Sequence, residues 1–190
     1  MAELLSNPTK LIKARKELSE EIGKDETIDE SHIFRLPFLQ AIVKETFRLH
    51  PPGPLLAPHK CDENVNILGF NVPKKAQILV NVWAMGRDST IWENSNMFMP
   101  ERFLECDINY KGNNFELIPF GAGKRICPGL PLPHRTVHLI VASLLHNFEW
   151  TLADGLKPED MSMEQQFGLS LKRIQSLKSS SYFINLGRYI

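Results

Sequence analysis

Cysteine is scarce in this sequence, and its scarcity limits the kinds of site that the chain can build. There are three cysteines among 190 residues, namely Cys61, Cys106 and Cys127. An odd number at wide spacing disfavours a disulfide framework, and no two cysteines share the Cys-x-x-Cys spacing of a structural metal site. Cys61 and Cys106 are expected to be free thiols, which leaves one cysteine for a special role.

Long apolar runs and an excess of charge of one sign are also missing. The longest candidate run, from Val137 to Trp150, is interrupted by polar residues and falls short of the ~20 apolar residues of a membrane span. The N-terminus has no basic segment followed by an apolar one, as a secretory signal would have. Lysine and arginine total 22, as do aspartate and glutamate, and this balance disfavours a nucleic-acid partner.

Apolar periodicity predicts a mainly helical (α+β) chain. Helices are expected over 9–22, over 36–50 and after Cys127, with a shorter helical turn over 29–34. Alternating residues predict strands at 65–67 and 76–83, whereas 84–126 and 179–190 show no regular pattern. The long helices carry wide apolar stripes, including Leu39–Phe47 and Val137–Phe148, and few other elements are present to cover them.

The most informative segment is a glycine-rich loop that leads into a cysteine. It reads Phe-Gly-Ala-Gly-Lys-Arg-Ile-Cys-Pro-Gly over residues 120–129. The helical pattern that follows predicts Cys127 at a helix start, where free amides and the positive dipole end favour a thiolate. Pro128 has no N–H, so Gly129 and Leu130 are the expected amide donors to the sulfur. The alternative interpretation is a buried free cysteine in a glycine turn.

This segment resembles the haem-binding signature of the cytochrome P-450 superfamily, Phe-x-x-Gly-x-Arg-x-Cys-x-Gly. All five positions match: Phe120, Gly123, Arg125, Cys127 and Gly129. The resemblance implies that Cys127 is the axial ligand of the iron of haem b, since a thiolate ligand favours O–O cleavage. It also implies that Phe120 covers the sulfur and that Arg125 neutralises a haem propionate. His59 stands where many relatives place an arginine toward a propionate.

Two further segments resemble the same family. Residues 45–48, Glu-Thr-Phe-Arg, resemble its Glu-x-x-Arg helix motif, and residues 100–103 resemble its Pro-Glu-Arg-Phe segment. A Glu–Arg pair at i, i+3 is commonplace and worth only ~0.3 kcal/mol on an exposed helix. The resemblance implies more, namely that Glu45, Arg48 and Arg102 form one buried network that fixes the irregular stretch against the helix.

Other segments, including 81–88, resemble plant members of the family that oxidise terpenoids and alkaloids, such as geraniol hydroxylases. The resemblance implies a monooxygenase that hydroxylates a small lipophilic substrate with O₂ and electrons from NADPH–cytochrome P-450 reductase. It places the full-length relative at the cytosolic face of the endoplasmic reticulum membrane. Lys124 and Arg135 are candidate contacts for the reductase, and Leu55–Ala57 and Phe167–Leu169 are candidates for lining the substrate pocket.

The resemblance covers residues 1–178, which correspond to the C-terminal portion of one P-450 domain, and leaves 179–190 as an atypical tail without the family's final strand. The oxygen-activating helix and the membrane anchor are expected to lie outside this chain. The chain is therefore interpreted either as the haem-binding fragment of an active enzyme or as a truncated, non-enzymatic product that at most binds haem. Without the anchor, the chain itself is expected in the cytoplasm.

The helix after the cysteine has two unusual features. If Pro128 is its first residue, Pro133 lies beyond the first turn and costs up to ~3 kcal/mol or a kink. His134 and His138 are four residues apart, a spacing that can bind zinc. No glutamate follows His134 and no third ligand is evident, so a zinc site is the weaker interpretation of this pair.

Overall fold

A computed structural model describes residues 1–23 and 26–184. The α-helices are α1 (Ala2–Ser6), α2 (Pro8–Glu21), α3 (Pro37–Leu49), α4 (Val82–Met85) and α5 (Pro131–Asn147). The 3₁₀ helices are η1 (Glu30–Arg35), η2 (Pro100–Phe103), η3 (Gly123–Arg125), η4 (Ala153–Gly155) and η5 (Pro158–Asp160). The strands are β1 (His59–Lys60), β2 (Val65–Ile67), β3 (Phe70–Val72), β4 (Gln77–Ile78), β5 (Phe148–Leu152), β6 (Gln165–Gln166), β7 (Lys172–Arg173) and β8 (Ser179–Phe183).

The long helices form where the apolar periodicity predicts them. α2 begins at Pro8 and α3 begins at Pro37. Proline is well tolerated there, because the N–H group that it lacks would form no hydrogen bond within the helix at the first position. The helical turn predicted over 29–34 is η1, and the Ser31 amide donates to the Asp29 carboxylate at its start, at 2.7 Å. The mainly helical prediction is therefore confirmed. Among the described residues, no helix combines the length and apolar character that a bilayer crossing requires.

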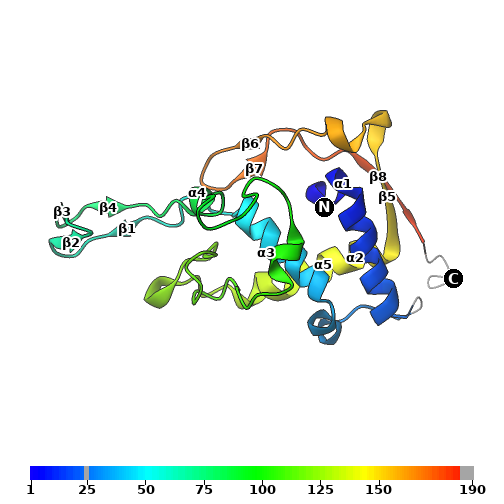
Figure 1. Cartoon of the computed structure of the whole chain (residues 1–190), viewed down its shortest axis with the longest axis horizontal. Coiled ribbons are helices and arrows are strands. Elements are labelled where there is room, and N and C mark those ends of the chain that lie inside the picture. The colour runs from blue at the N-terminus through cyan, green and yellow to red at the C-terminus, as the bar shows by residue number, and fades with distance from the viewer. Residues whose placement is uncertain (24–25, 185–190) are drawn as a thin grey trace.

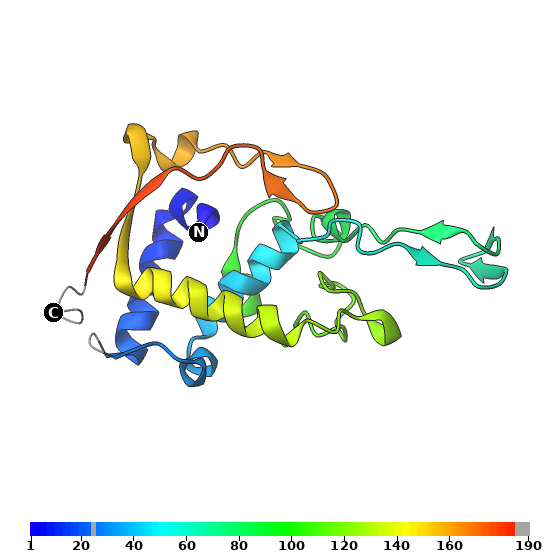
Figure 2. The same ribbon diagram turned by 180° about the vertical axis from the view of Figure 1, so that it is seen from behind.

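α3 lies between two apolar clusters and is buried on nearly every side. Leu39 and Ile42 belong to a cluster that also contains residues of α1, α2 and α5. Val43 and Phe47 belong to a second cluster with aromatic residues of the irregular stretch, including Trp92. The expectation that the apolar stripe of α3 lacks partners is therefore wrong. α5 crosses α2 and α3 on one side of the molecule (Figure 2) and keeps some apolar surface exposed.

The β structure consists of four two-stranded antiparallel ladders in the described residues: β1–β4, β2–β3, β5–β8 and β6–β7. The β1–β4 and β2–β3 ladders form an arm that projects away from the helices (Figure 1). The strand predicted over 76–83 is shorter than expected, because Asn81 caps α4 and accepts a hydrogen bond from the Ala84 amide at 3.0 Å. Residues 82 and 83 consequently belong to a helix.

The serine-rich segment near the C-terminus forms a strand that the sequence pattern does not predict. β8 pairs with β5 in antiparallel register, from Phe148 opposite Phe183 to Leu152 opposite Ser179. The two phenylalanine rings lie 4.3 Å apart between centroids, so a cross-strand aromatic pair compensates for the weak strand preference of serine. The expected loss of the final strand is therefore wrong, while 185–190 of the predicted tail lie outside the described residues.

The burial of α3 gives a direct test of the core. Leu39 has no exposed surface, so Leu39→Ala is expected to lower the free energy of unfolding by about 2–5 kcal/mol through lost contacts and a cavity. The matched control is Leu132→Ala, which removes the same atoms from a side chain that is 68% exposed. Urea unfolding followed by circular dichroism measures both changes. Equal effects of the two substitutions would contradict this assignment of the core.

Candidate functional site

A buried carboxylate and two arginines hold the irregular stretch against α3. Arg48 donates from Nε to Glu45 Oε2 and from Nη2 to Glu45 Oε1, each at 2.7 Å. Neither of these two side chains has exposed surface. Arg102, from η2, donates from Nε to Glu45 Oε1 at 3.3 Å. The structure thus brings together all three residues of the expected network. Arg48 binds the Glu45 carboxylate through two parallel N–H···O hydrogen bonds, and this bidentate arrangement is the strongest for such a pair.

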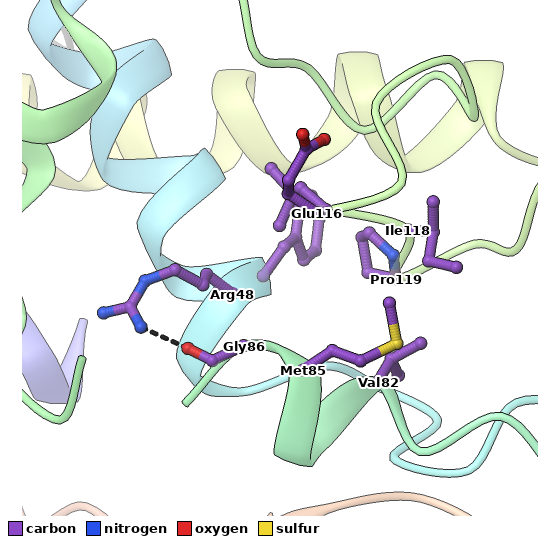
Figure 3. A pocket seen from close by; sticks show the side chains of 9 residues that line it. Arg48, Val82, Met85, Gly86, Glu116, Ile118 and Pro119 are labelled. Carbon is purple, nitrogen blue, oxygen red and sulfur yellow. Dashed lines mark hydrogen bonds between the residues drawn. The ribbon is translucent and has the colours of Figure 1, made fainter. Parts of the chain in front are cut away.

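The network also binds the backbone of the stretch that follows α4. The Met99 amide donates to Glu45 Oε1 at 2.7 Å, and Arg102 Nη1 donates to the Glu93 carbonyl at 2.7 Å. Arg48 donates further to three backbone carbonyl oxygens, those of Gly86, Ser95 and Met97. Figure 3 shows the guanidinium of Arg48 directed at the Gly86 carbonyl. A chain segment with little regular structure therefore has its polar backbone groups satisfied by side chains.

Gly86 also belongs to this site, although the sequence motifs mark it only as one residue of segment 81–88. A Cβ atom at this position would lie 2.2 Å from the Arg48 carbonyl oxygen, which is far inside contact distance. Its φ of −66° is ordinary, so the requirement is for space rather than for backbone freedom. α4 consequently lies directly against the end of α3. Val82 and Met85 line a small crevice there with Pro119, next to the cysteine loop (Figure 3).

The cysteine loop is a series of tight turns. Gly121 and Gly123 have φ angles of 77° and 61°, a backbone region that side chains disfavour. The Cys127 amide donates to the Phe120 carbonyl at 2.9 Å, which closes the loop. The Cys127 side chain is exposed, so the interpretation as a buried free cysteine is wrong.

The loop differs from the expectation at its junction with the helix. α5 begins at Pro131 rather than beside the cysteine, and a turn separates the two. The Leu130 amide donates at 3.2 Å to the carbonyl oxygen of Cys127, so it is not the expected donor to the sulfur. Gly129 lies close to the thiol, because a Cβ atom there would be 3.7 Å from Sγ. Because the helix starts late, Pro133 falls within its first turn, and the predicted cost or kink does not arise.

Phe120 is fixed by an aromatic cluster beneath the loop. Its ring lies 5.1 Å from Phe47 and 5.9 Å from Tyr110, measured between centroids. The Tyr110 hydroxyl shares a 2.7 Å hydrogen bond with Nδ1 of His134 on α5. His138 Nδ1 is hydrogen-bonded to the His134 carbonyl oxygen, so both histidines of the possible zinc pair have other partners. Among the described residues, no group of three or more His, Cys, Asp or Glu is arranged to hold a metal ion.

A cavity of about 760 Å³ lies beside the cysteine. Cys127, Phe120, Arg125 and His59 all line it, although His59 comes from β1 and the other three come from the loop. Gly123 and Gly129 shape the loop and are not among the lining residues. Of the candidates for a substrate pocket, three line this cavity: Leu56, Ala57 and Leu169.

The lining residues fit the haem that the family resemblance implies. The volume lies within the ~300–1,000 Å³ of typical cofactor pockets. One thiol is presented to the cavity, with apolar side chains around it and with Arg125 and His59 available to propionate groups. A single soft ligand in an apolar cleft suits an iron that already has the nitrogen ligands of a porphyrin. Cys127 would hold the iron, and Phe120 would line the cavity beside it.

Comparisons with known proteins agree with this geometry. The family model described as Cytochrome P450 matches residues 1–177. Cytochrome P450 76T24 of Catharanthus roseus is 61% identical over 172 residues, which are 90% of this chain and 34% of the relative. Geraniol 8-hydroxylase of the same plant is 51% identical over 179 residues, which are 94% of this chain and 36% of the relative. The chain thus spans about a third of the length of the curated relatives that it matches.

The same similarity appears among solved structures. A zebrafish cytochrome P450 solved with abiraterone superimposes with a TM-score of 0.84 at 30% identity, over 96% of this chain and 41% of that chain. A second structure of a zebrafish cytochrome P450, with progesterone, gives a TM-score of 0.82 at 31% identity.

The buried network predicts a large and specific loss of stability. Glu45→Ala leaves the Arg48 guanidinium buried without its counter-ion, and this is expected to cost about 3–5 kcal/mol in the free energy of unfolding. Glu101→Ala is the control, because Glu101 is partly exposed and its ion pairs with Lys10 and Lys13 are worth about 0–1 kcal/mol. Chemical denaturation of the two variants measures both values. A Glu45→Ala protein as stable as Glu101→Ala would show that the network does not hold the stretch.

Proposed function

Because this chain belongs to the cytochrome P450 family, we propose that it forms the haem-binding part of a monooxygenase that hydroxylates a small lipophilic metabolite with dioxygen. Haem b is the cofactor of this family. Electrons come from NADPH–cytochrome P450 reductase, and the full-length protein works at the cytosolic face of the endoplasmic reticulum. The observation that carries the proposal is the arrangement of Cys127, Phe120, Arg125 and His59 around one cavity.

Four of the lining residues share three tasks in this proposal. Haem held by a cysteine thiolate supplies the oxidising chemistry, since the thiolate pushes electron density toward the iron and favours O–O cleavage. Cys127 provides the thiolate, and Phe120 keeps water away from the sulfur. Arg125 and His59 bind the propionates, with Arg125 contributing a permanent positive charge. The Glu45 network acts at a distance from the cavity, because it fixes the backbone that leads into the cysteine loop.

The substrate proposal draws on the relatives and on the cavity wall. Geraniol 8-hydroxylase and geranylhydroquinone 3''-hydroxylase are among the similar proteins, and both names describe hydroxylation of a geranyl compound. Leu56, Ala57 and Leu169 give the cavity apolar groups of the kind that bind such a molecule. We expect a terpenoid of similar size. Lys124 is exposed and Arg135 is 61% exposed while paired with Glu30, so both are accessible to an acidic reductase surface.

A second proposal concerns the chain by itself. Cys127 is exposed, and the loop and the arm enclose the cavity incompletely. An oxygenase needs a site from which water is excluded, because water entry diverts the reaction toward reduced oxygen species. We therefore propose that residues 1–190 alone bind haem at most and form no product, whereas a longer chain with a covered cavity is active.

The iron ligand is tested by substitution at each cysteine. The reduced CO complex of the haem-loaded chain is expected to show the red-shifted Soret band of thiolate ligation. Cys127→Ser should abolish that band, because a serine hydroxyl does not supply a thiolate. Cys61→Ser and Cys106→Ser are the controls and should leave the band unchanged. A normal band in Cys127→Ser, or its loss in either control, would overturn the assignment of the ligand.

Catalysis by the isolated chain is tested by product formation. The haem-loaded chain, supplied with reductase, NADPH and a panel of monoterpenoids, should consume NADPH without forming hydroxylated products above a Cys127→Ala control. Products are measured by gas chromatography with mass detection, and hydrogen peroxide is measured in parallel. Hydroxylated product well above that control would reject the second proposal and would support activity of this chain alone.

A further inference from the structure

A tyrosine and a histidine form a hydrogen-bonded pair next to the cavity, and none of the tasks above uses it. Tyr110 lies in the irregular stretch and is 3% exposed. Its hydroxyl is 2.7 Å from Nδ1 of His134, which lies in the first turn of α5 and is half-buried. The Tyr110 ring packs edge-on against Phe47 at 5.0 Å between centroids. Both the phenol and the imidazole are therefore held in fixed positions by elements far apart in the sequence.

The surroundings keep both groups of the pair neutral near pH 7. Burial raises the pKa of the Tyr110 phenol above its usual value. Burial lowers the pKa of His134, and the nearby charges of Lys111 and Arg135 lower it further, against an opposing effect of Glu30. A neutral imidazole is a base with a free lone pair, and Nδ1 is the atom that faces the phenol. The phenol can then lose its proton to His134 at the moment at which it loses an electron.

The pair is also connected to the cavity. The Tyr110 ring lies 5.9 Å from the ring of Phe120, which lines the cavity together with Cys127. Phe120 is joined to Cys127 by the hydrogen bond from the Cys127 amide to its carbonyl oxygen. One packed ring thus separates the phenol from whatever occupies the cavity.

Trp92 and Trp83 are also oxidisable, but each is less suited than Tyr110 to give up an electron. Trp92 has the guanidinium groups of Arg48 and Arg102 at 5.4 and 6.0 Å from its ring. Trp83 has the guanidinium of Arg87 at 4.2 Å. A cation over an aromatic face stabilises the neutral ring and opposes a positive charge on it. Among the described residues, no cation lies over the Tyr110 ring, and its hydroxyl has a base beside it instead.

We propose that Tyr110 is a one-electron donor to an oxidised porphyrin in the cavity beside Cys127, and that His134 accepts the phenol proton in the same step. The electron passes from the phenol to the porphyrin, which is reduced by one electron. The O–H bond breaks, a new N–H bond forms at His134 Nδ1, and a neutral tyrosyl radical and an imidazolium remain. This relay rests on the proposed function, and it removes oxidising equivalents from the thiolate when no substrate consumes them.

The test places a one-electron oxidant in the cavity. The chain is loaded with zinc protoporphyrin, and the porphyrin is excited by a short light pulse. A cobalt(III) ammine in the solution then takes one electron from the excited porphyrin. Tyr110 should then reduce the resulting porphyrin radical cation by one electron. The oxidised Tyr110 should be detected as a neutral tyrosyl radical by its absorption and EPR spectra. The signal should form more slowly in deuterated water, because a proton moves with the electron.

Three variants separate the relay from a structural role. Tyr110→Phe keeps the packed ring and should lose the tyrosyl signal, whereas Tyr182→Phe removes a 61% exposed tyrosine and should keep it. His134→Gln can still hydrogen-bond but is no longer a base, so the radical yield should fall several-fold and the solvent isotope effect should disappear. A tyrosyl signal that survives in Tyr110→Phe, or a tryptophan radical in the unmodified chain, would overturn the relay. Failure of the chain to bind porphyrin would instead contradict the proposed function, and the relay with it.

Discussion

The ion pair between Glu45 and Arg48 is the interaction on which the rest of the structure depends. Both charges lie on one turn of α3 and have no contact with solvent, so each is stable only while the other is in place. The remaining hydrogen-bonding capacity of the pair is used on backbone groups that follow α4, and Arg102 adds a third charge from η2. A segment with almost no regular structure is thereby fixed to a rigid helix, and the cysteine loop follows this segment later in the chain.

The cysteine loop is positioned from two sides. On one side, Phe120 packs on Phe47 of α3, the helix that carries the ion pair. On the other side, α5 follows the loop after a short turn and places His134 against Tyr110. Positive φ angles at Gly121 and Gly123 let the loop turn sharply, so that Cys127 and Phe120 reach the same cavity. Because rigid elements pack against the loop, the exposed Cys127 thiol is held in one position, as an iron ligand must be.

Local patterns in the sequence predicted the long helices, because α2, α3 and α5 follow a 3.6-residue apolar period. Cys127 was distinguished from Cys61 and Cys106 by the resemblance of residues 120–129 to the haem-binding signature of the family. Features that depend on distant residues were not predictable in this way. Gly86 is required only because α4 lies against Arg48, 38 residues earlier in the chain. β8 forms because β5 offers it a partner, although serine has little preference for strands.

The position of the iron ligand is tested most directly by X-ray absorption at the iron edge of the haem-loaded chain. Coordination by Cys127 predicts one sulfur scatterer in addition to the four porphyrin nitrogens, and its absence in Cys127→Ser. A spectrum with only nitrogen and oxygen neighbours in the unmodified chain would contradict the assignment of this cavity as the haem site. So would a sulfur scatterer that persists after the substitution.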